Sequence, residues 1–345
     1  MRKLIAKPAF LRTVIYFLLI IAALLGVTAI KFYNDLKKER SQSTSNVSPT
    51  SPSATSQVTT VRMKDGKLTS ALLLFETPEE SEKLKPLKSQ LQQLLETERQ
   101  QGNIFRASLL VRKLVNGEWM GINPNEGFHP GSLIKVPVLI TYLKQSEEEP
   151  GLLDKKLLYT TPNFAVPDQT FKDSTILRNG QSYSIRQLLF EMVAKSDNYA
   201  TLLLLQHIDV QGFKKLFTSL GLPEPPEKDL NLTISADNYS KFFITLYNAG
   251  YLTIPNSEYA LSILAKSNFK AGIVTGFPPG TVIAHKFGEF NNGPNKELHE
   301  AGIIYYNNSP YLIVLMTEGK DIPHLTGVFN RVATAINEGL APGKL

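Results

Sequence analysis

The chain has 345 residues, of which 42% are hydrophobic, with 37 Lys and Arg against 31 Asp and Glu and no Cys. This composition excludes a disordered protein and leaves open whether the chain forms one large domain or two. The absence of cysteine excludes disulfides, thiolate nucleophiles, iron–sulfur centres and zinc sites built on Cys.

The net charge of +6 comes from the N-terminal end of the chain. Residues 1–40 contain eight basic and two acidic side chains, and the remaining 305 residues carry 29 of each sign. A nucleic-acid-binding domain depends on a basic surface that neutralises phosphates, and a neutral body without a nucleic-acid motif gives no support for that class. We therefore expect no nucleic-acid partner.

Residues 13–30 form an uncharged run, rich in Leu, Ile, Val and Ala, between Arg12 and Lys31. As a helix this run would span roughly 27 Å, close to a hydrocarbon core of about 30 Å, and the flanking cations can snorkel. The cations in residues 1–12 favour a cytoplasmic N-terminus. The run therefore predicts a single-pass transmembrane anchor with the rest of the chain outside the cytoplasm.

A cleaved signal peptide is the alternative interpretation of this run. Small residues before and at Ala29 suit cleavage there, and the body would then be secreted. Both interpretations export the body. Residues 31–66 are predicted to be a flexible linker, because residues 41–60 contain seven Ser, five Thr and two Pro without a charged or aromatic side chain.

The body, residues 67–345, begins with a predicted helix over 83–98, where leucines recur at helical spacing. Apolar runs at 106–114 and 118–122 flank a Val-Asn-Gly turn and predict a β-hairpin. Helical patterns with breaks at Pro and Gly then occupy about 132–250.

Strand patterns return at the C-terminal end, at 282–287, 301–306 and 311–317, followed by a predicted helix at 325–337. Short hairpins imply antiparallel pairing. The sequence therefore predicts an α+β fold, in which a mainly antiparallel sheet is built from both chain ends, with flanking helices and an inserted all-helical lobe.

Three short motifs follow one another along the body: Ser132-Leu133-Ile134-Lys135, Ser196-Asp197-Asn198 and Lys286-Phe287-Gly288. Each is weak alone, and residues 267–270 are a second Ser-x-x-Lys that no other signal supports. Order and context strengthen the three, because the first opens a predicted helix, the second interrupts helical pattern and the third ends a predicted strand.

The first motif suits a serine nucleophile. A serine hydroxyl becomes reactive when a neighbouring base takes its proton, and Lys135 lies three residues after Ser132, on the same face of a helix. To act near neutral pH, Lys135 must lower its pKa by roughly three units, which burial and a second cation would achieve. Lys286 is the candidate second cation and would also bind a substrate carboxylate.

The second and third motifs supply the remaining groups. Ser196 can relay a proton to a leaving nitrogen, and the Asn198 amide can hold a substrate carbonyl or orient Lys135. Both residues could instead cap the next helix, which would not exclude catalysis. The backbone N–H groups of Ser132 and Glu289 are the candidate donors to a developing oxyanion.

At these residues the chain resembles the active-site serine enzymes of the class A β-lactamase and penicillin-binding protein superfamily, over most of residues 70–345. The stretches 129–138, 195–201 and 298–306 support the resemblance. It implies an acylated Ser132, proton transfer by Lys135 and Ser196, and substrate binding by Asn198, Lys286 and Gly288.

The implied substrates are β-lactams or the D-alanyl-D-alanine ends of peptidoglycan stem peptides. The expected location is a bacterial cell membrane, with the catalytic domain outside the cytoplasm. Three functions stay open: a tethered β-lactam hydrolase, a peptidoglycan carboxypeptidase or transpeptidase, and a binding module of the same fold without turnover.

Two departures from the family pattern stand out. Phe287 occupies the position where the third motif usually has Thr or Ser, so one hydrogen bond to a substrate carboxylate is lost. Residues 227–231 match the Glu-x-x-Leu-Asn pattern of the deacylating glutamate, but residues 233–235 indicate the start of the next helix, so the loop is short. Glu227 is thus either a deacylation base or an ordinary loop carboxylate.

The five histidines give no support for a Ser-His-Asp triad or a metal site. The sequence contains neither a Gly-x-Ser-x-Gly elbow nor a His-Glu-x-x-His motif, and no two histidines have the spacing of metal ligands. We expect structural or surface roles for them, with His129 and His285 close enough in sequence to shape the site. The sequence predicts no metal and no cofactor.

Overall fold

The computed structural model describes residues 67–69, 79–164, 169–171, 173–226, 232–307 and 309–341. All of them belong to the second of two units into which the chain divides, residues 58–345. The predicted span at 13–30, the linker and Glu227 lie outside the described residues. Within the described ranges, no helix has the length and apolar character needed to cross a bilayer.

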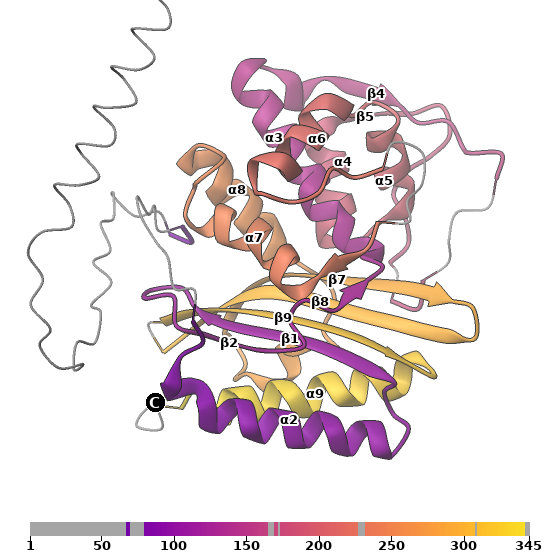
Figure 1. Cartoon of the computed structure of the whole chain (residues 1–345). Coiled ribbons are helices and arrows are strands. Elements are labelled where there is room, and N and C mark those ends of the chain that lie inside the picture. The colour runs from indigo at the N-terminus through magenta and orange to yellow at the C-terminus, as the bar shows by residue number, and fades with distance from the viewer. Residues whose placement is uncertain are drawn as a thin grey trace, which may run out of the picture. The chain divides into compact units, whose positions relative to one another are not determined.

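A five-stranded antiparallel sheet forms the centre of this unit, with the strand order β2-β1-β9-β8-β7 (Figure 1). Its strands come from both ends of the described chain: β1 (Arg106–Lys113), β2 (Trp119–Ile122), β7 (Val282–Asn292), β8 (Asn295–Tyr306) and β9 (Ser309–Gly319). The central β1–β9 pair joins the two ends, with Leu110 opposite Val314. The predicted α+β fold and antiparallel sheet are therefore confirmed.

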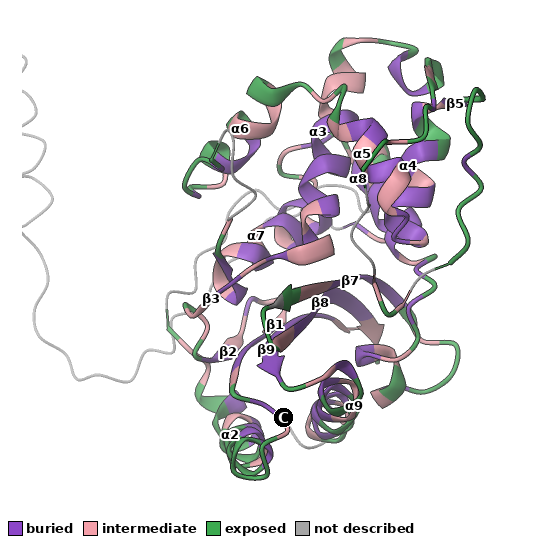
Figure 2. Ribbon diagram, turned by 90° about the vertical axis from the view of Figure 1, so that its right-hand side faces the viewer, coloured by how far each residue is buried: buried purple, intermediate pink, exposed green. Residues whose placement is uncertain are grey.

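Two helices cover one face of the sheet, α2 (Lys85–Gln100), which follows the short turn η1 (Glu82–Leu84), and α9 (Ile322–Gly339). Side chains alternate between the two faces of a strand. In β9, Ile313 and Leu315 accordingly join the core beneath α2 and α9, whereas Val314 joins the core of the helical lobe. Figure 2 shows the largely buried sheet between α2 and α9 on one side and the helical lobe on the other.

The other face of the sheet carries the inserted lobe. Its helices and helical turns are η2 (Gly131–Ile134), α3 (Lys135–Glu148), η3 (Leu152–Asp154), α4 (Ile185–Ala194), α5 (Asn198–Leu205), α6 (Val210–Ser219), α7 (Ala236–Tyr247) and α8 (Ile254–Leu264). The helical turn η4 (Ile273–Gly276) packs against α9 instead, and its Ile273 belongs to the core beneath α2 and α9. The expectation of an all-helical lobe is wrong in detail, because two short antiparallel pairs lie in or beside it. They are β4 (Lys156–Leu158) with β5 (Ser182–Ser184), and β3 (Gly127–Phe128) with β6 (Ile234–Ser235). These pairs satisfy backbone groups of segments that connect helices.

The C-terminal strands extend beyond their apolar patterns. The pattern of β7 ends at Phe287, yet the strand continues to Asn292, which pairs with Asn295 across a tight turn. Gly293 permits this turn, because its φ of +58° lies in the left-handed region. The ladder therefore continues through polar residues because the hairpin partner supplies backbone hydrogen bonds.

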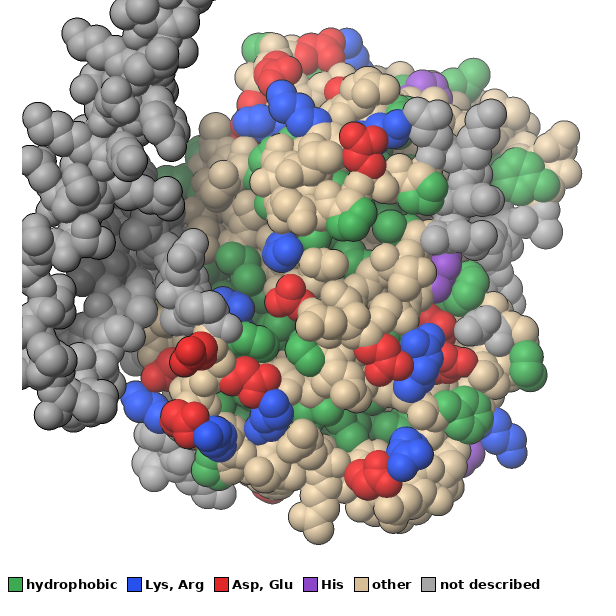
Figure 3. All heavy atoms as spheres, viewed as in Figure 1, with side chains coloured by type: hydrophobic (Ala, Val, Ile, Leu, Met, Phe, Trp, Pro, Cys, Tyr) green, Lys and Arg blue, Asp and Glu red, His purple; other side chains and the backbone are tan. Residues whose placement is uncertain are grey.

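Basic and acidic side chains are mixed on the described surface. Figure 3 shows Lys and Arg beside Asp and Glu on one face. Pairs such as Lys88 with Glu80, at 2.5 Å, remain partly exposed and contribute about 0–1 kcal/mol each. The fold therefore depends mainly on the two apolar cores on either side of the sheet.

Candidate active site

Ser132 lies on the 3-10 turn η2, and α3 begins at Lys135. The prediction placed Ser132 at the start of a helix; the tighter turn has a similar consequence, since residues three apart nearly eclipse in a 3-10 helix. Ser132 and Lys135 therefore lie on the same side of the chain. Ser132 is partly exposed, whereas only 2% of Lys135 is accessible.

Three side chains outside the sequence motifs hold this turn, and one of them is His129, which was expected to shape the site. The Tyr239 hydroxyl of α7 donates to the Leu133 carbonyl at 2.8 Å. The backbone N–H of Gly131 donates to His129 Nδ1 at 3.1 Å, and the His129 carbonyl accepts from His299 Nε2 at 2.9 Å. The turn that carries Ser132 is thus anchored from the helical lobe and from β8.

Lys135 Nζ donates three hydrogen bonds: to the Ser196 carbonyl at 2.7 Å, to Ser196 Oγ at 3.0 Å and to Asn198 Oδ1 at 2.8 Å. Three is the number of donors on an ammonium group. Burial lowers the pKa of Lys135 to about 7, although the carboxylates of Asp197 and Glu289 oppose this shift. At neutral pH a large fraction of Lys135 is therefore the neutral amine, which donates two of these three bonds and has a lone pair that can accept a proton.

Ser196 lies between two amines, because Lys286 Nζ also donates to Ser196 Oγ, at 3.0 Å. The residue sits at the bend between α4 and α5, is 1% exposed and has a φ of +56°, a left-handed conformation that is costly for serine. The alternative that Ser196 or Asn198 caps α5 does not hold: Asp197 is the cap and accepts from Ala200 N at 2.9 Å. Because Asp197 supplies the cap, the side chains of Ser196 and Asn198 are left to contact Lys286 and Lys135.

Lys286 is fully buried on β7, the edge strand of the sheet. Burial and the nearby charge of Lys135 hold its pKa well below the usual range. Besides Ser196 Oγ, its amine donates to the Phe287 carbonyl at 2.8 Å. Within the described part of the chain, these two acceptors match the two N–H groups of a neutral amine, and protonation would add a third.

Gly288 allows β7 to approach the turn that carries Ser132. A Cβ on Gly288 would lie 2.6 Å from the Pro130 carbonyl oxygen and 3.0 Å from the Leu133 nitrogen. A Cβ on Gly131, whose φ is +51°, would lie 2.4 Å from the Glu289 carbonyl oxygen and 3.2 Å from its nitrogen. The backbone of Glu289 is therefore close to the turn of Ser132, as an oxyanion site formed by these two residues requires.

The segment 169–171 was not identified from the sequence as part of the site. The Glu289 carboxylate accepts from the backbone nitrogens of Thr170 and Phe171, at 2.8 and 3.0 Å. Gln169 Nε2 donates to the Ser196 carbonyl at 3.0 Å. The segment thus connects the edge of β7 to the α4–α5 bend, and no short motif could indicate this long-range contact.

Phe287 packs into an aromatic cluster. Its ring stacks on Phe269 at 4.2 Å and meets Phe171 edge to face at 6.0 Å. The Lys286 amine lies 4.1 Å from the centroid of the same ring. The position where a carboxylate-binding hydroxyl was expected therefore supplies an aromatic wall beside the buried lysine.

The histidines lie in structural networks. His285 Nδ1 and Glu300 Oε1 are 2.6 Å apart, both side chains are buried, and Glu300 also accepts from the Ile273 nitrogen. His299 contacts Glu297 as well as His129. Among the described residues, no group of three or more His, Asp or Glu side chains is arranged to hold a metal ion.

The model of a family described as "Beta-lactamase enzyme family" matches residues 86–340. A beta-lactamase from Chitinophaga pinensis is similar in structure, with a TM-score of 0.64 and 20% identity, over 74% of this chain and 100% of that one.

Two further similar structures are of PBP-A. One has 21% identity and a TM-score of 0.64, over 76% of this chain and 98% of that one. The other is a mutant described as an acyl-enzyme complex with penicillin G, with 21% identity and a TM-score of 0.63, over 74% and 96%. At this identity the structures establish a shared fold. A search of curated proteins finds no match.

Proposed function

The chain belongs to the beta-lactamase enzyme family, and on this premise we propose that Ser132 attacks the amide of a β-lactam and forms an acyl-enzyme. As a member of this family, the chain is a serine hydrolase that acts on amide bonds. The observation that carries the proposal is the buried amine of Lys135, which lies one turn from Ser132 and hydrogen bonds to Ser196.

Acylation begins with transfer of the Ser132 hydroxyl proton to neutral Lys135, while Ser132 Oγ bonds to the β-lactam carbonyl carbon. The carbonyl oxygen becomes an oxyanion that accepts from the backbone N–H groups of Ser132 and Glu289. The carbon–nitrogen bond then breaks. The nitrogen takes a proton from Ser196 Oγ, which is replenished by Lys135, so the amine returns to its neutral form.

Two groups orient the substrate. A substrate carboxylate beside the Lys286 amine favours its protonated form, whose third N–H then donates to that carboxylate, and Gly288 keeps this strand close to the nucleophile. Lys135 holds Asn198 through Oδ1, and the Asn198 side chain is our candidate ligand for a substrate carbonyl. Binding at both ends places the β-lactam carbonyl over Ser132.

Hydrolysis is completed when water attacks the acyl ester, and Glu227 is our candidate for the base that activates this water. We place the reaction outside the cytoplasm, with residues 13–30 as a membrane anchor. The uncharged run and its flanking cations support this location.

A D-alanyl-D-alanine carboxypeptidase or transpeptidase is the second candidate. The same acylation chemistry fits that amide, and the similarity to PBP-A is as close as that to the Chitinophaga pinensis beta-lactamase, since both TM-scores are 0.64. The two candidates differ in the lifetime of the penicilloyl enzyme. Fast loss indicates a β-lactamase, and a persistent adduct together with D-alanine release from a stem peptide indicates the peptidoglycan enzyme.

The test is covalent labelling of the full-length chain, purified in detergent, with penicillin G. We expect a penicilloyl mass on the peptide that contains Ser132 and its absence in Ser132→Ala. Ser267→Ala is the matched control, because Ser267 is the buried serine of the second Ser-x-x-Lys sequence, and it should label normally. Failure of Ser132 to react with penicillin G and with several cephalosporins would overturn the proposal and leave a binding module without acylation.

A further inference from the structure

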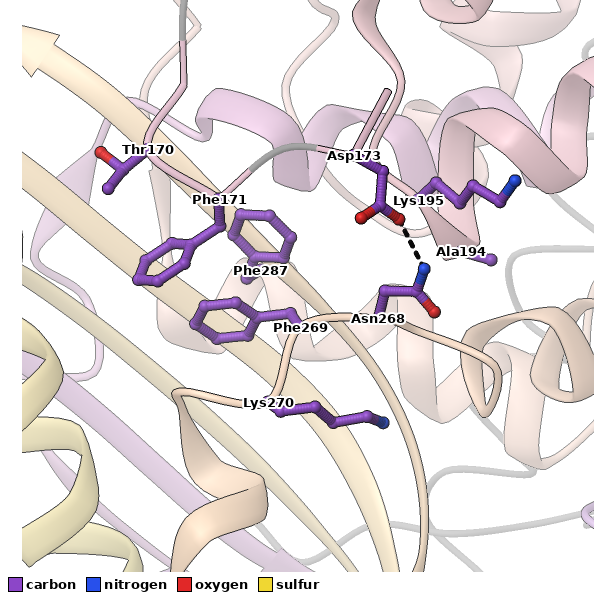
Figure 4. A pocket seen from close by; sticks show the side chains of 9 residues that line it. All are labelled: Thr170, Phe171, Asp173, Ala194, Lys195, Asn268, Phe269, Lys270 and Phe287. Carbon is purple, nitrogen blue, oxygen red and sulfur yellow. Dashed lines mark hydrogen bonds between the residues drawn. The ribbon is translucent and has the colours of Figure 1, made fainter. Parts of the chain in front are cut away.

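A cavity of about 280 Å³ borders the candidate active site. Its aromatic wall consists of Phe171, Phe269 and Phe287 (Figure 4). Thr170, Ala194 and four polar residues, Asp173, Lys195, Asn268 and Lys270, complete the lining. Asn268, Phe269 and Lys270 belong to the second Ser-x-x-Lys sequence, which thereby has a place beside the site although it contributes no nucleophile to it.

The three rings form one packed surface. Phe269 stacks on Phe287, and Phe171 stands edge to face against Phe269 at 4.8 Å. Phe269 and Phe287 are each only 4% exposed, so their orientation is fixed by packing. Rigid aromatic surfaces of this kind bind planar apolar groups, because the rings lose little conformational freedom on binding.

The order of residues along β7 gives the position of this cavity relative to the reaction. Gly288 and Glu289 contact the turn of Ser132, where the acyl carbon would lie. Phe287 precedes Gly288 along β7 and lies next to Lys286, whose amine contacts Ser196 Oγ. Lys195, which directly precedes Ser196, also lines the cavity. The cavity therefore adjoins the group proposed to protonate the leaving nitrogen.

The polar side of the cavity carries two lysines and one aspartate, and only Lys270 has no carboxylate partner among the described residues. Asp173 accepts a hydrogen bond from Asn268 at 2.5 Å, and Lys195 pairs with Glu191 at 3.2 Å. Lys270 donates to the Ser267 carbonyl, and its exposed ammonium is balanced by no carboxylate among its described contacts. Together with Lys286 behind Phe287, this side suits the carboxylate that flanks the leaving nitrogen of a β-lactam.

We propose that this cavity is a subsite for an aromatic substituent on the leaving-group side of the substrate, so that the enzyme prefers β-lactams with a planar ring beside the carboxylate. An apolar cavity of about 150 Å³ can hold benzene, so the volume here accommodates a phenyl ring with its linker. On this proposal Phe287 contributes to substrate binding. A hydroxyl at this position would contact the substrate carboxylate, whereas the Phe287 ring contacts the aromatic substituent next to that carboxylate. This inference rests on the proposed acylation of Ser132.

The experiment compares two cephalosporins that share one acyl side chain and carry either a methyl or a styryl group at carbon 3. The second-order rate constant for acylation of Ser132 is measured by intact mass for the full-length chain in detergent. A buried aromatic pair contributes about 1 kcal/mol, so we expect the styryl compound to react about five- to tenfold faster. Phe287→Leu should bring this ratio close to unity.

Further variants separate the subsite from general packing. Phe171→Leu changes a partly exposed ring and keeps the test available if the buried Phe287→Leu variant does not fold; it should lower the same ratio. Phe105→Leu is the matched control, because Phe105 is 46% exposed and lies outside the cavity lining, and it should preserve the preference.

The outcomes distinguish this inference from the proposed function. Equal acylation by both compounds in the native chain, or a preference that survives both cavity variants, would overturn the aromatic subsite while leaving Ser132 acylation intact. Failure of both compounds to label Ser132 would overturn the subsite and the proposed function together.

Discussion

Lys135 Nζ donates hydrogen bonds to both the carbonyl oxygen and the hydroxyl of Ser196, at 2.7 and 3.0 Å. These contacts fix a buried amine whose pKa lies at about 7. The same burial that makes the amine a suitable base disfavours its charged form, so reactivity and the pH dependence of stability have one physical origin.

Stability should rise with pH between about 8 and 10, because the unfolded chain holds a proton on Lys135 that the folded chain has lost. One such proton adds about 1.4 kcal/mol per pH unit to the free energy of unfolding. Lys286 adds a contribution of the same sign, since its pKa is also lowered.

Lys135→Met should reduce the slope of the unfolding free energy against pH by about 1.4 kcal/mol per pH unit, which is the contribution of one proton. Urea unfolding followed by the fluorescence of Trp119, the only tryptophan of the chain, measures it at several pH values. Equal slopes in the native chain and the variant would mean that Lys135 remains protonated when folded.

Gly288→Ala should slow acylation by about a hundredfold, because its Cβ would lie 2.6 Å from the Pro130 carbonyl and force β7 away from the turn of Ser132. Gly250→Ala is the control, since its nearest neighbour, Thr245 Oγ1, would be 3.3 Å away. Stopped-flow acylation with a chromogenic cephalosporin compares the two. A Gly288→Ala variant with native kinetics would show that the close approach is unnecessary.

Glu289→Gln should lower the pH at which acylation is half-maximal. The Glu289 carboxylate opposes the effect of burial on Lys135, so its removal lowers the pKa of that amine further. The variant should also weaken the hold on segment 169–171, since it replaces an acceptor that binds two backbone N–H groups. The exposed Glu338→Gln serves as control, and a shift to higher pH in Glu289→Gln would contradict the electrostatic explanation.

Much of the fold could be predicted because both chain ends carry local signals. Leucine spacing identified α2, and the apolar runs around Val-Asn-Gly identified the β1–β2 hairpin. The lengths of β7 and β8 could not be predicted, because their polar ends are held by partner strands and not by their own propensity.

The site was predictable where its residues lie in short motifs. Lys135, Ser196 and Lys286 contact one another, and Ser132 lies on the turn that precedes α3; their catalytic roles remain predictions. Tyr239 and Gln169 contact the site from distant parts of the chain, and nothing in their local sequence distinguishes them from packing or loop residues. The capping role of Asp197 was missed because Ser, Asp and Asn are all good helix caps.

The most direct test of the proposed base is the pH dependence of Ser132 acylation in the full-length chain, measured with a substrate whose ionisation is constant over the range. We expect the rate constant to rise with pH and to reach half its plateau at about 7, where Lys135 loses its proton. A rate constant that is unchanged from about pH 5 to 9, or that falls as the pH rises through 7, would contradict a neutral Lys135 as the base.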